Sequence, residues 1–120
     1  MRGDFRLRKE ERITRRSEFQ KISKQGVRYN TKNFSVIIFS HNNEAIQRLG
    51  ISVSKKVGGA VTRNRVKRLL REFFRLHKEL LPKASDFLFI AKSGSAYLNY
   101  SALSKEMVGF LTAPDLRKPD

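Results

Sequence analysis

The sequence predicts an α+β domain in which helices pack against a small sheet. Two observations support this fold class. Apolar residues recur with a helical period in three segments and with the pattern of strands in three others, in the order helix, strands, long helix, strand, helix. The chain has 120 residues, 39% of them apolar, which is enough for one domain with a modest core and too short for two.

The N-terminal part of the chain is expected to form a basic arm followed by a short helix. Residues 1–16 carry seven Lys or Arg and three acids, with little periodic apolar content, and we expect an extended or loosely held arm. Ser17 is a suitable N-cap for a helix that places Phe19 and Ile22 on one face. Gly26 is a suitable residue to end this helix.

Two strands are expected next, over Asn33–Ser40 and Arg48–Ser54, with residues 41–44 as a turn between them. In the first strand, Phe34 shares one side with Val36 and Ile38, while Ile37 and Phe39 face the other side. In the second, the side expected to face outward carries only small residues, which are Gly50, Ser52 and Ser54. Such a side leaves open backbone surface on which another molecule could lie.

The second half of the chain predicts a long helix, an inner strand and a last helix. The helical pattern extends from about Ala60 to Leu81 and is closed by Pro82. Asp86–Ala91 is almost continuously apolar, as in a strand covered on both sides. A final helix is expected over Ser101–Leu111, and Ala113–Asp120 is expected to be an unstructured, flexible tail.

The charge of the chain narrows the class of partner. Lys and Arg number 26 against 11 Asp and Glu, which gives a formal net charge of +15. A polyanion relieves the self-repulsion of such a chain; nucleic acid is the usual partner and an acidic membrane is the alternative. The chain has no cysteine, which excludes disulfides and thiolate zinc sites. Its start does not resemble a signal peptide and its apolar runs are shorter than a membrane span, so we expect a cytoplasmic protein.

The positive charge is concentrated around the long helix. Between Lys55 and Lys78 there are nine Lys or Arg and one acid, Glu72. On a helical projection, the arc opposite the apolar one carries Arg63, Asn64, Lys67, Arg68, Arg71, Arg75 and Lys78, with Arg65 to one side. A merely solvated face normally mixes charges of both signs. The near absence of acids therefore favours contact with nucleic-acid phosphates.

One segment resembles a known family. Gly50–Arg75 reads GISVSKKVGGAVTRNRVKRLLREFFR and resembles the signature region of the bacterial ribonuclease P protein family. The centre of the resemblance is the Arg63-Asn64-Arg65 box, preceded by Ser-Val-Ser-Lys-Lys-Val-Gly and followed by Lys-Arg-x-x-Arg-Glu. A weaker similarity extends over nearly the whole chain.

The resemblance implies a single RNA-binding domain over residues 1–120. Its fold would be a two-layer αβββαβα sandwich with a small mixed sheet and a left-handed βαβ crossover, like a ribosomal-protein RNA-binding domain. The family's partners are the ribonuclease P catalytic RNA, with one protein per RNA, and precursor tRNA, with neither DNA nor membrane. The protein subunit promotes endonucleolytic removal of the 5′ leader, while the RNA and the Mg²⁺ bound mainly to it carry the chemistry.

The resemblance also implies site residues by position. The expected RNA-contacting residues are Lys55, Lys56, Arg63, Asn64, Arg65, Lys67, Arg68 and Arg71. The expected residues of the leader cleft are Phe19, Phe34, Ile37 and Ser52. Ser23 and Ile37 stand where some relatives carry aromatic residues, so leader contact here would depend more on the backbone, Phe19 and cations than on base stacking. Phe19 fits a core position of the first helix equally well.

No catalytic or metal-binding group is expected in the protein, because the sequence offers no paired carboxylates and its two histidines, His41 and His77, are isolated. Three other functions remain as alternatives. A general RNA-binding or ribosomal protein would share the charge but have no role in tRNA cleavage. A DNA-binding module would read a groove with the long helix, which has few side chains suited to base edges. A membrane-surface helix would have to remove its apolar face from the core.

Overall fold

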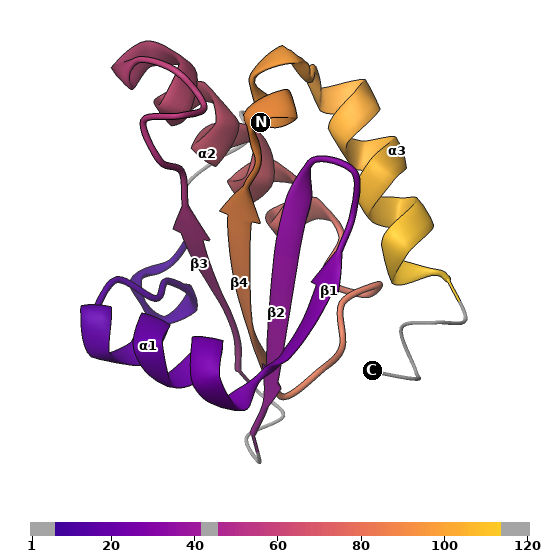
Figure 1. Ribbon diagram of the computed structural model, residues 1–120. Coiled ribbons are helices and arrows are strands. Elements are labelled where there is room, and N and C mark those ends of the chain that lie inside the picture. Colours follow the sequence, from indigo (N-terminus) through magenta and orange to yellow (C-terminus); the bar gives the residue numbers. More distant parts are fainter. Residues whose placement is uncertain (1–6, 42–45, 114–120) are drawn as a thin grey trace.

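The computed structural model describes residues 7–41 and 46–113. Its main elements follow the expected order αβββαβα, with two short 3₁₀ helices, η1 and η2, in addition (Figure 1). The elements are η1 (Lys9–Glu11), α1 (Arg16–Gln25), β1 (Val27–Asn30), β2 (Phe34–Ser40), β3 (Gln47–Ser52), α2 (Ala60–Leu76), β4 (Ser85–Ala91), η2 (Ser93–Tyr97) and α3 (Tyr100–Leu111). The expected turn at 42–44 and the tail from residue 114 onward lie outside the described residues.

The strands form one mixed sheet in the order β1-β2-β4-β3. The β1–β2 and β2–β4 pairs are antiparallel, whereas β3 and β4 are parallel. In Figure 1, α2 lies behind the sheet and β4 stands to the right of β3, so the β3-α2-β4 connection is a left-handed crossover. This handedness is contrary to that of nearly all such connections.

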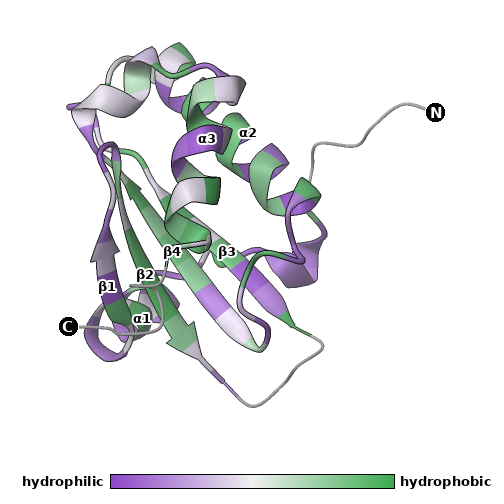
Figure 2. Cartoon of the chain, turned by 90° about the vertical axis from the view of Figure 1, so that its right-hand side faces the viewer, coloured by the Kyte–Doolittle hydropathy of each residue, from purple (hydrophilic) through white to green (hydrophobic). Residues whose placement is uncertain are grey.

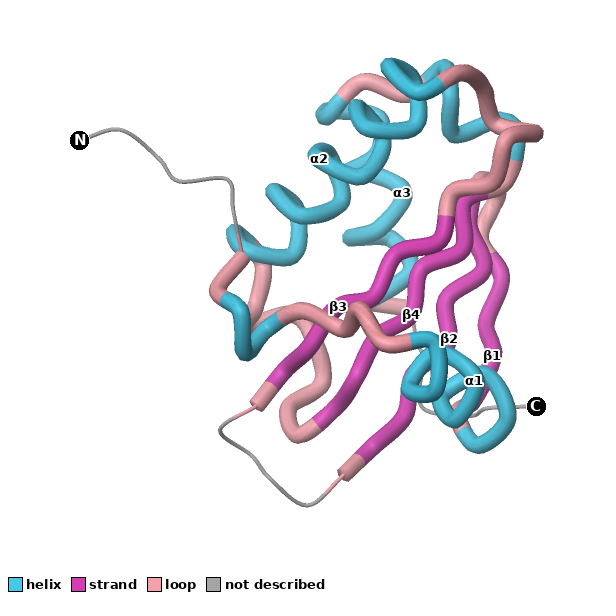
Figure 3. Tube along the Cα trace, turned by 90° about the vertical axis from the view of Figure 1, so that its left-hand side faces the viewer, coloured by secondary structure: helices cyan, strands magenta, loops and turns pink. Residues whose placement is uncertain are grey.

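Helices cover both faces of the sheet. In Figure 3, α2 and α3 lie on one side of the strands and α1 lies on the other. β4 serves both faces, because Phe87 and Phe89 point toward α2 and α3 while Leu88 packs under α1. The apolar residues concentrate along β2 and β4 in the middle of the sheet (Figure 2). The prediction of an inner, continuously apolar strand is therefore confirmed.

The larger core lies between the sheet and the α2–α3 layer. The Phe34 and Phe89 rings meet edge-to-face with their centroids 6.4 Å apart, and Phe74 meets Phe87 in the same way at 5.9 Å. Such pairs add about 0.5–1.5 kcal/mol to the stability that comes from apolar burial. The smaller core, on the α1 side, consists of Ile13, Ile22, Ile37 and Leu88.

An ion cluster around the buried Asp86 joins α1 to the first residues of β3 and β4. The Arg48 guanidinium donates two hydrogen bonds to the Asp86 carboxylate, at 2.9 and 2.8 Å, and one to Glu18 at 2.8 Å. These hydrogen bonds, above all those to Asp86, raise the pKa of Arg48 against the opposing effect of burial. Asp86 is only 2% exposed, so its charge depends on this partner for compensation.

A second polar cluster fixes α3 against the hairpin between β1 and β2. The Glu106 carboxylate accepts hydrogen bonds from the Thr31 hydroxyl at 2.6 Å, the Asn33 main-chain N–H at 2.8 Å and the Asn33 side-chain amide at 2.7 Å. Lys92 donates from its ammonium group to the Thr31 carbonyl at 2.8 Å. These hydrogen bonds hold α3 and the end of β4 to the hairpin at this side of the larger core.

The N-terminal segment was expected to be an extended or loosely held arm. Residues 7–15 are docked against the fold, with extended backbone at Arg12 and Arg15, so the loosely held alternative is wrong for them. Leu7 and Ile13 are buried, and the Ile13 N–H donates to the Leu49 carbonyl of β3 at 3.0 Å. Glu11 pairs with Lys78 beyond the end of α2. Burial would raise the pKa of Glu11, but this pairing and a hydrogen bond from the Arg8 N–H hold it below its ordinary value. Residues 1–6 lie outside the described part.

The boundaries of α1 and α2 differ from the predictions. α1 begins one residue before Ser17, and no side chain caps it; it ends before Gly26 as predicted. α2 ends at Leu76, five residues short of Leu81, and the turn beyond it is held instead by the Gln47 amide. That amide donates to the carbonyls of Lys78, Leu81 and Pro82 at 3.1–3.2 Å.

The strand β1 was not predicted by residue pattern. It has four residues, Val27–Asn30, and its alternation of half-buried and exposed side chains is too short to stand out in the sequence. It pairs with β2 through a register that sets Val27 opposite Ile38. β1 covers one edge of β2 and so makes β2 an inner strand.

We predict that Gly26→Ala destabilises the fold while Gly109→Ala does not. A Cβ at residue 26 would lie 2.8 Å from the Ile22 carbonyl oxygen and 2.6 Å from a methyl carbon of Ile37. The neighbouring atoms must shift to make room for this Cβ, and the cost of these shifts should lower the free energy of unfolding by about 1–3 kcal/mol. At residue 109, an exposed position on α3, a Cβ meets nothing within 4 Å, and alanine should raise the free energy of unfolding by about 0.5–1 kcal/mol. Urea denaturation measures both; equal effects of the two substitutions would contradict the prediction.

Candidate nucleic-acid interface

The outward side of α2 and the loop before it form a surface of cations, here called the basic ridge. Lys55, Lys56, Asn64 and Arg68 are exposed, and Arg63, Lys67 and Arg71 are half-buried. None of the six cations among them has an acidic partner within 4 Å in the part of the chain that the structure describes. The ridge is therefore a preorganised row of charges that is free to bind an external anion.

Arg65 differs from the other residues expected to contact RNA. Its two terminal nitrogens donate to the main-chain carbonyls of Leu98 at 2.7 Å and Ala96 at 2.5 Å. These bonds tie α2 to η2 on the flank away from Lys67 and Arg71. Within the Arg-Asn-Arg box, this side chain has a structural contact that its spacing in the sequence does not reveal.

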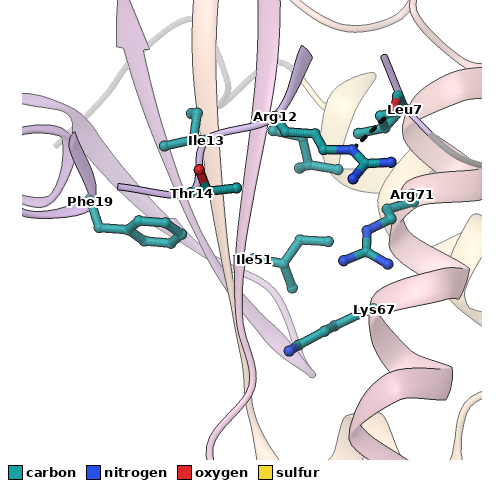
Figure 4. Close-up of a pocket in the computed structure, with 9 residues that line it drawn as sticks. Leu7, Arg12, Ile13, Thr14, Phe19, Ile51, Lys67 and Arg71 are labelled. Atoms are coloured by element: carbon teal, nitrogen blue, oxygen red, sulfur yellow. Dashed lines mark hydrogen bonds between the residues drawn. The ribbon is translucent and has the colours of Figure 1, made fainter. Parts of the chain in front are cut away.

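Three cations surround one hollow beside the ridge. Arg12 from the N-terminal segment and Lys67 and Arg71 from α2 line a cavity of about 260 Å³ over β3, as Figure 4 shows. Burial lowers the pKa of the Arg71 guanidinium, and the neighbouring Arg12 cation lowers it further. An anion in this hollow would relieve that repulsion. Arg12 was missed as a site residue because only the docking of the N-terminal segment brings it to α2.

A groove runs between α1 and the sheet face beneath it. It is a hollow of about 500 Å³ lined by Arg16, Phe19, Gln20, Ser23, Lys24, Ser52, Leu88 and Ile90. Two predicted cleft residues, Phe19 and Ser52, lie in it. Arg16 and Lys24 add positive charge that the sequence did not mark as part of a site, because both belong to an ordinary short helix. The groove thus combines cations with an apolar floor.

The other two predicted cleft residues, Phe34 and Ile37, are not in the groove. Both have no exposed surface, and they lie on opposite faces of β2. Phe34 packs on Phe89 under the α2–α3 layer, and Ile37 packs with Ile22 under α1. The expectation of an exposed sheet face around these two residues is therefore wrong, because β2 is an inner strand covered on both sides.

Phe19 stands at the junction of the groove and the cation-lined hollow. Its ring lines both. It also covers the small residue Gly50, at which an added Cβ would lie 3.1 Å from the tip of the ring. The predicted bare face of β3 is thus partly covered by Phe19, and the remaining open surface leads from Ser52 past Phe19 toward Lys67.

Potential metal ligands are not clustered in the described part of the chain. No group of three or more His, Asp or Glu that could hold a metal ion occurs among the described residues. His77 stacks on Phe73 with ring centroids 4.2 Å apart, and His41 lies 3.5 Å from the buried Asp86 carboxylate. Within residues 7–41 and 46–113, no helix is long and apolar enough to cross a membrane.

Comparison with known proteins places this arrangement in a family. The family model described as Ribonuclease P matches residues 7–114, which is nearly the whole chain. The chain belongs to the ribonuclease P protein family. It is thus a subunit of an endoribonuclease that acts in tRNA processing, and its family membership implies the ribonuclease P RNA as partner.

Individual relatives agree with this assignment. The ribonuclease P protein component of Syntrophus aciditrophicus is 42% identical over 106 residues, covering 88% of each chain. That of Desulfovibrio desulfuricans is 44% identical over 110 residues, covering 89% of this chain and 85% of the relative. The solved structure of the Staphylococcus aureus RNase P protein is 34% identical, with a TM-score of 0.77 over 92% of this chain and 98% of that one.

We predict that Arg65→Ala destabilises this ribonuclease P protein more than Arg68→Ala. The first substitution removes two charge-assisted hydrogen bonds between α2 and η2, which should cost about 1–3 kcal/mol of unfolding free energy. The second removes an exposed side chain and should change it by less than about 0.5 kcal/mol. Thermal and urea unfolding of the RNA-free proteins measures both. Equal stability of the two variants would show that the Arg65 contact contributes nothing to the fold.

Proposed function

We propose that this protein binds the ribonuclease P catalytic RNA through the basic ridge and the 5′ leader of precursor tRNA through the α1 groove. It thereby promotes endonucleolytic removal of the leader to give the mature 5′ end. The observation that carries the proposal is the unpaired basic ridge, which meets the groove at Phe19.

The ridge suits the backbone of a folded RNA. Its cations project from one rigid helix and the loop before it, and the first acid on that helix is Glu72, in its last half. Each phosphate that such a cation contacts releases a condensed counterion, so the affinity is largely electrostatic and independent of base sequence. Arginine forks can also grip a phosphate with two hydrogen bonds. A folded RNA is recognised in this way by its shape and its phosphates.

The groove suits a single strand. Its floor is formed by Leu88 and Ile90, Phe19 provides the one aromatic ring in its lining, and Arg16 and Lys24 stand along α1. Single strands bind by combining stacking on aromatic rings with cations that follow the backbone. With Ser23 as a small lining residue, the groove has space but little stacking surface, so cations and Phe19 would supply most of the leader affinity.

The hollow between Arg12, Lys67 and Arg71 would hold one phosphate of the bound strand at the end of the groove. Three cations converge there without a carboxylate in the lining. Binding a phosphate there would favour the docked position of the N-terminal segment, because Arg12 belongs to that segment.

The catalytic groups and the Mg²⁺ of the reaction would belong to the RNA. The protein would act by neutralising phosphates, by stabilising the folded RNA and by raising the affinity for precursor tRNA, with one protein per RNA. Every positive charge that it brings near the RNA backbone replaces part of the counterion atmosphere. Its contribution to cleavage should consequently be greatest at low Mg²⁺ concentration.

We predict that replacing Arg63, Lys67 and Arg68 together by Ala flattens the salt dependence of RNA binding. Each lost phosphate contact should reduce the slope of log K against log salt by about 0.7–0.9. The matched control replaces three exposed lysines outside the ridge, Lys32, Lys83 and Lys105, which removes the same charge. Filter binding to ribonuclease P RNA, repeated at salt concentrations from about 50 to about 400 mM, measures the slopes. If both triple variants give the same slope, general charge and not the ridge determines binding.

The test of the whole function is reconstitution. The purified protein is mixed with a ribonuclease P RNA at low Mg²⁺ concentration, and cleavage of a precursor tRNA that carries a 5′ leader is followed. We expect cleavage at the mature 5′ end that requires both components. Phe19→Ala should weaken binding of the leader-bearing precursor by about tenfold and leave binding of mature tRNA unchanged. Phe39→Ala, which removes another half-buried ring from the same sheet face, is the control. If the protein neither stimulates cleavage nor prefers this RNA, it is a general RNA-binding protein.

A further inference from the structure

Tyr97 is an aromatic side chain that the fold does not use. It is 90% exposed, and every other Phe or Tyr within residues 7–41 and 46–113 is buried or half-buried. It lies in η2, and both of its neighbours, Ala96 and Leu98, pack against the larger core. An exposed ring contributes no apolar burial to folding. The ring is therefore accessible to a binding partner.

The backbone that carries Tyr97 is rigid. The Ser95 N–H donates to the Lys92 carbonyl at 3.0 Å, and the Leu98 N–H donates to the Ser95 carbonyl at 3.2 Å. Arg65 then fixes the carbonyls immediately before and after Tyr97. The ring is thus presented from a turn that is clamped on both sides. Because the backbone is already ordered, a contact made by the ring does not require the turn to become ordered on binding.

The surroundings of Tyr97 are positively charged. The Arg65 guanidinium lies beneath the turn, and neither the segment 92–100 nor the segment 55–71 contains an acid. η2 lies beside the N-terminal turns of α2 at one end of the molecule (Figure 1). The ring therefore stands at the flank of the basic ridge, where an anionic partner would be close to it. This charge complementarity selects a nucleic acid and not an apolar protein surface.

We propose that Tyr97 stacks on an unpaired base of the catalytic RNA, beside the phosphates that the basic ridge holds. This inference rests on the proposed function of the ridge. The π-face of any base suits the ring, so the contact needs no particular sequence. The catalytic RNA is the partner and not the leader, because the leader groove lies on the α1 face of the sheet, whereas η2 contacts α2.

The contact can be observed directly by fluorescence. The chain has no tryptophan, so Tyr97→Trp introduces a single probe at an exposed position. Titration with ribonuclease P RNA should quench its emission and protect it from acrylamide, with saturation at one RNA per protein. Precursor tRNA alone should leave the emission unchanged. Emission that stays constant while the RNA binds, or that responds only to precursor tRNA, would overturn the inference.

Affinity measurements separate stacking from charge. Tyr97→Ala should weaken binding of ribonuclease P RNA by about 5- to 100-fold at every salt concentration, without changing the salt slope. Tyr97→Phe keeps the ring and should bind within about twofold of the unchanged protein, whereas Tyr97→Leu, apolar without a π-face, should bind like the alanine variant. The stacking proposal would be overturned if the alanine variant bound as tightly as the unchanged protein, or if the leucine and phenylalanine variants bound equally well. If the unchanged protein binds ribonuclease P RNA no more tightly than unrelated RNA, the proposed function of the ridge fails instead.

Discussion

The burial of β4 on both faces is the constraint on which the rest of the structure depends. A strand with no solvent-facing side requires cover from two layers, and α1 supplies one while α2 and α3 supply the other. α2 can cover the sheet only with its apolar side, so its cations must point outward. The one charged residue of the strand, Asp86, lies near its start and is compensated by Arg48. The basic ridge and the groove are both consequences of how this strand is enclosed.

The features that could be predicted from the sequence are those with a strong local period. β4 is apolar along nearly its whole length, and α3 and the first part of α2 repeat apolar residues with a helical period. The excess of positive charge around α2 marks the basic ridge from the sequence alone. The features that could not be predicted depend on tertiary contacts. The described N-terminal segment buries two apolar residues, Leu7 and Ile13, too few to show a period, and its other contacts, such as the Glu11–Lys78 pair, join residues distant in sequence. The end of α2 is likewise set by the distant Gln47. Phe34 and Ile37 are buried because the α2–α3 layer covers one face of β2 and α1 covers the other, which the pattern of a single strand does not show.

The candidate site likewise has some features that the local sequence predicts and others that depend on tertiary packing. The spacing of charges identifies which residues share a helix, but only packing decides which flank of that helix another element covers. Arg65 belongs to the same motif as Arg63 and is nevertheless turned toward η2. Arg12 lies outside the motif and nevertheless stands across a hollow from Arg71. Position in a motif therefore predicts the surface as a whole better than it predicts the role of a single side chain.

The strand order has a consequence for how the chain acquires its structure during synthesis. β2 and β3 follow one another in the sequence but are not neighbours, because β4 lies between them. The ribosome must therefore release residue 91, about three quarters of the chain, before the sheet can close. Until then β3 lacks its partner, and α2 exposes an apolar side with nothing to cover. Because all pairing of β3 within the sheet depends on this late insertion, folding is expected to be governed by contacts distant in sequence and to be slower than that of a helical protein of equal length.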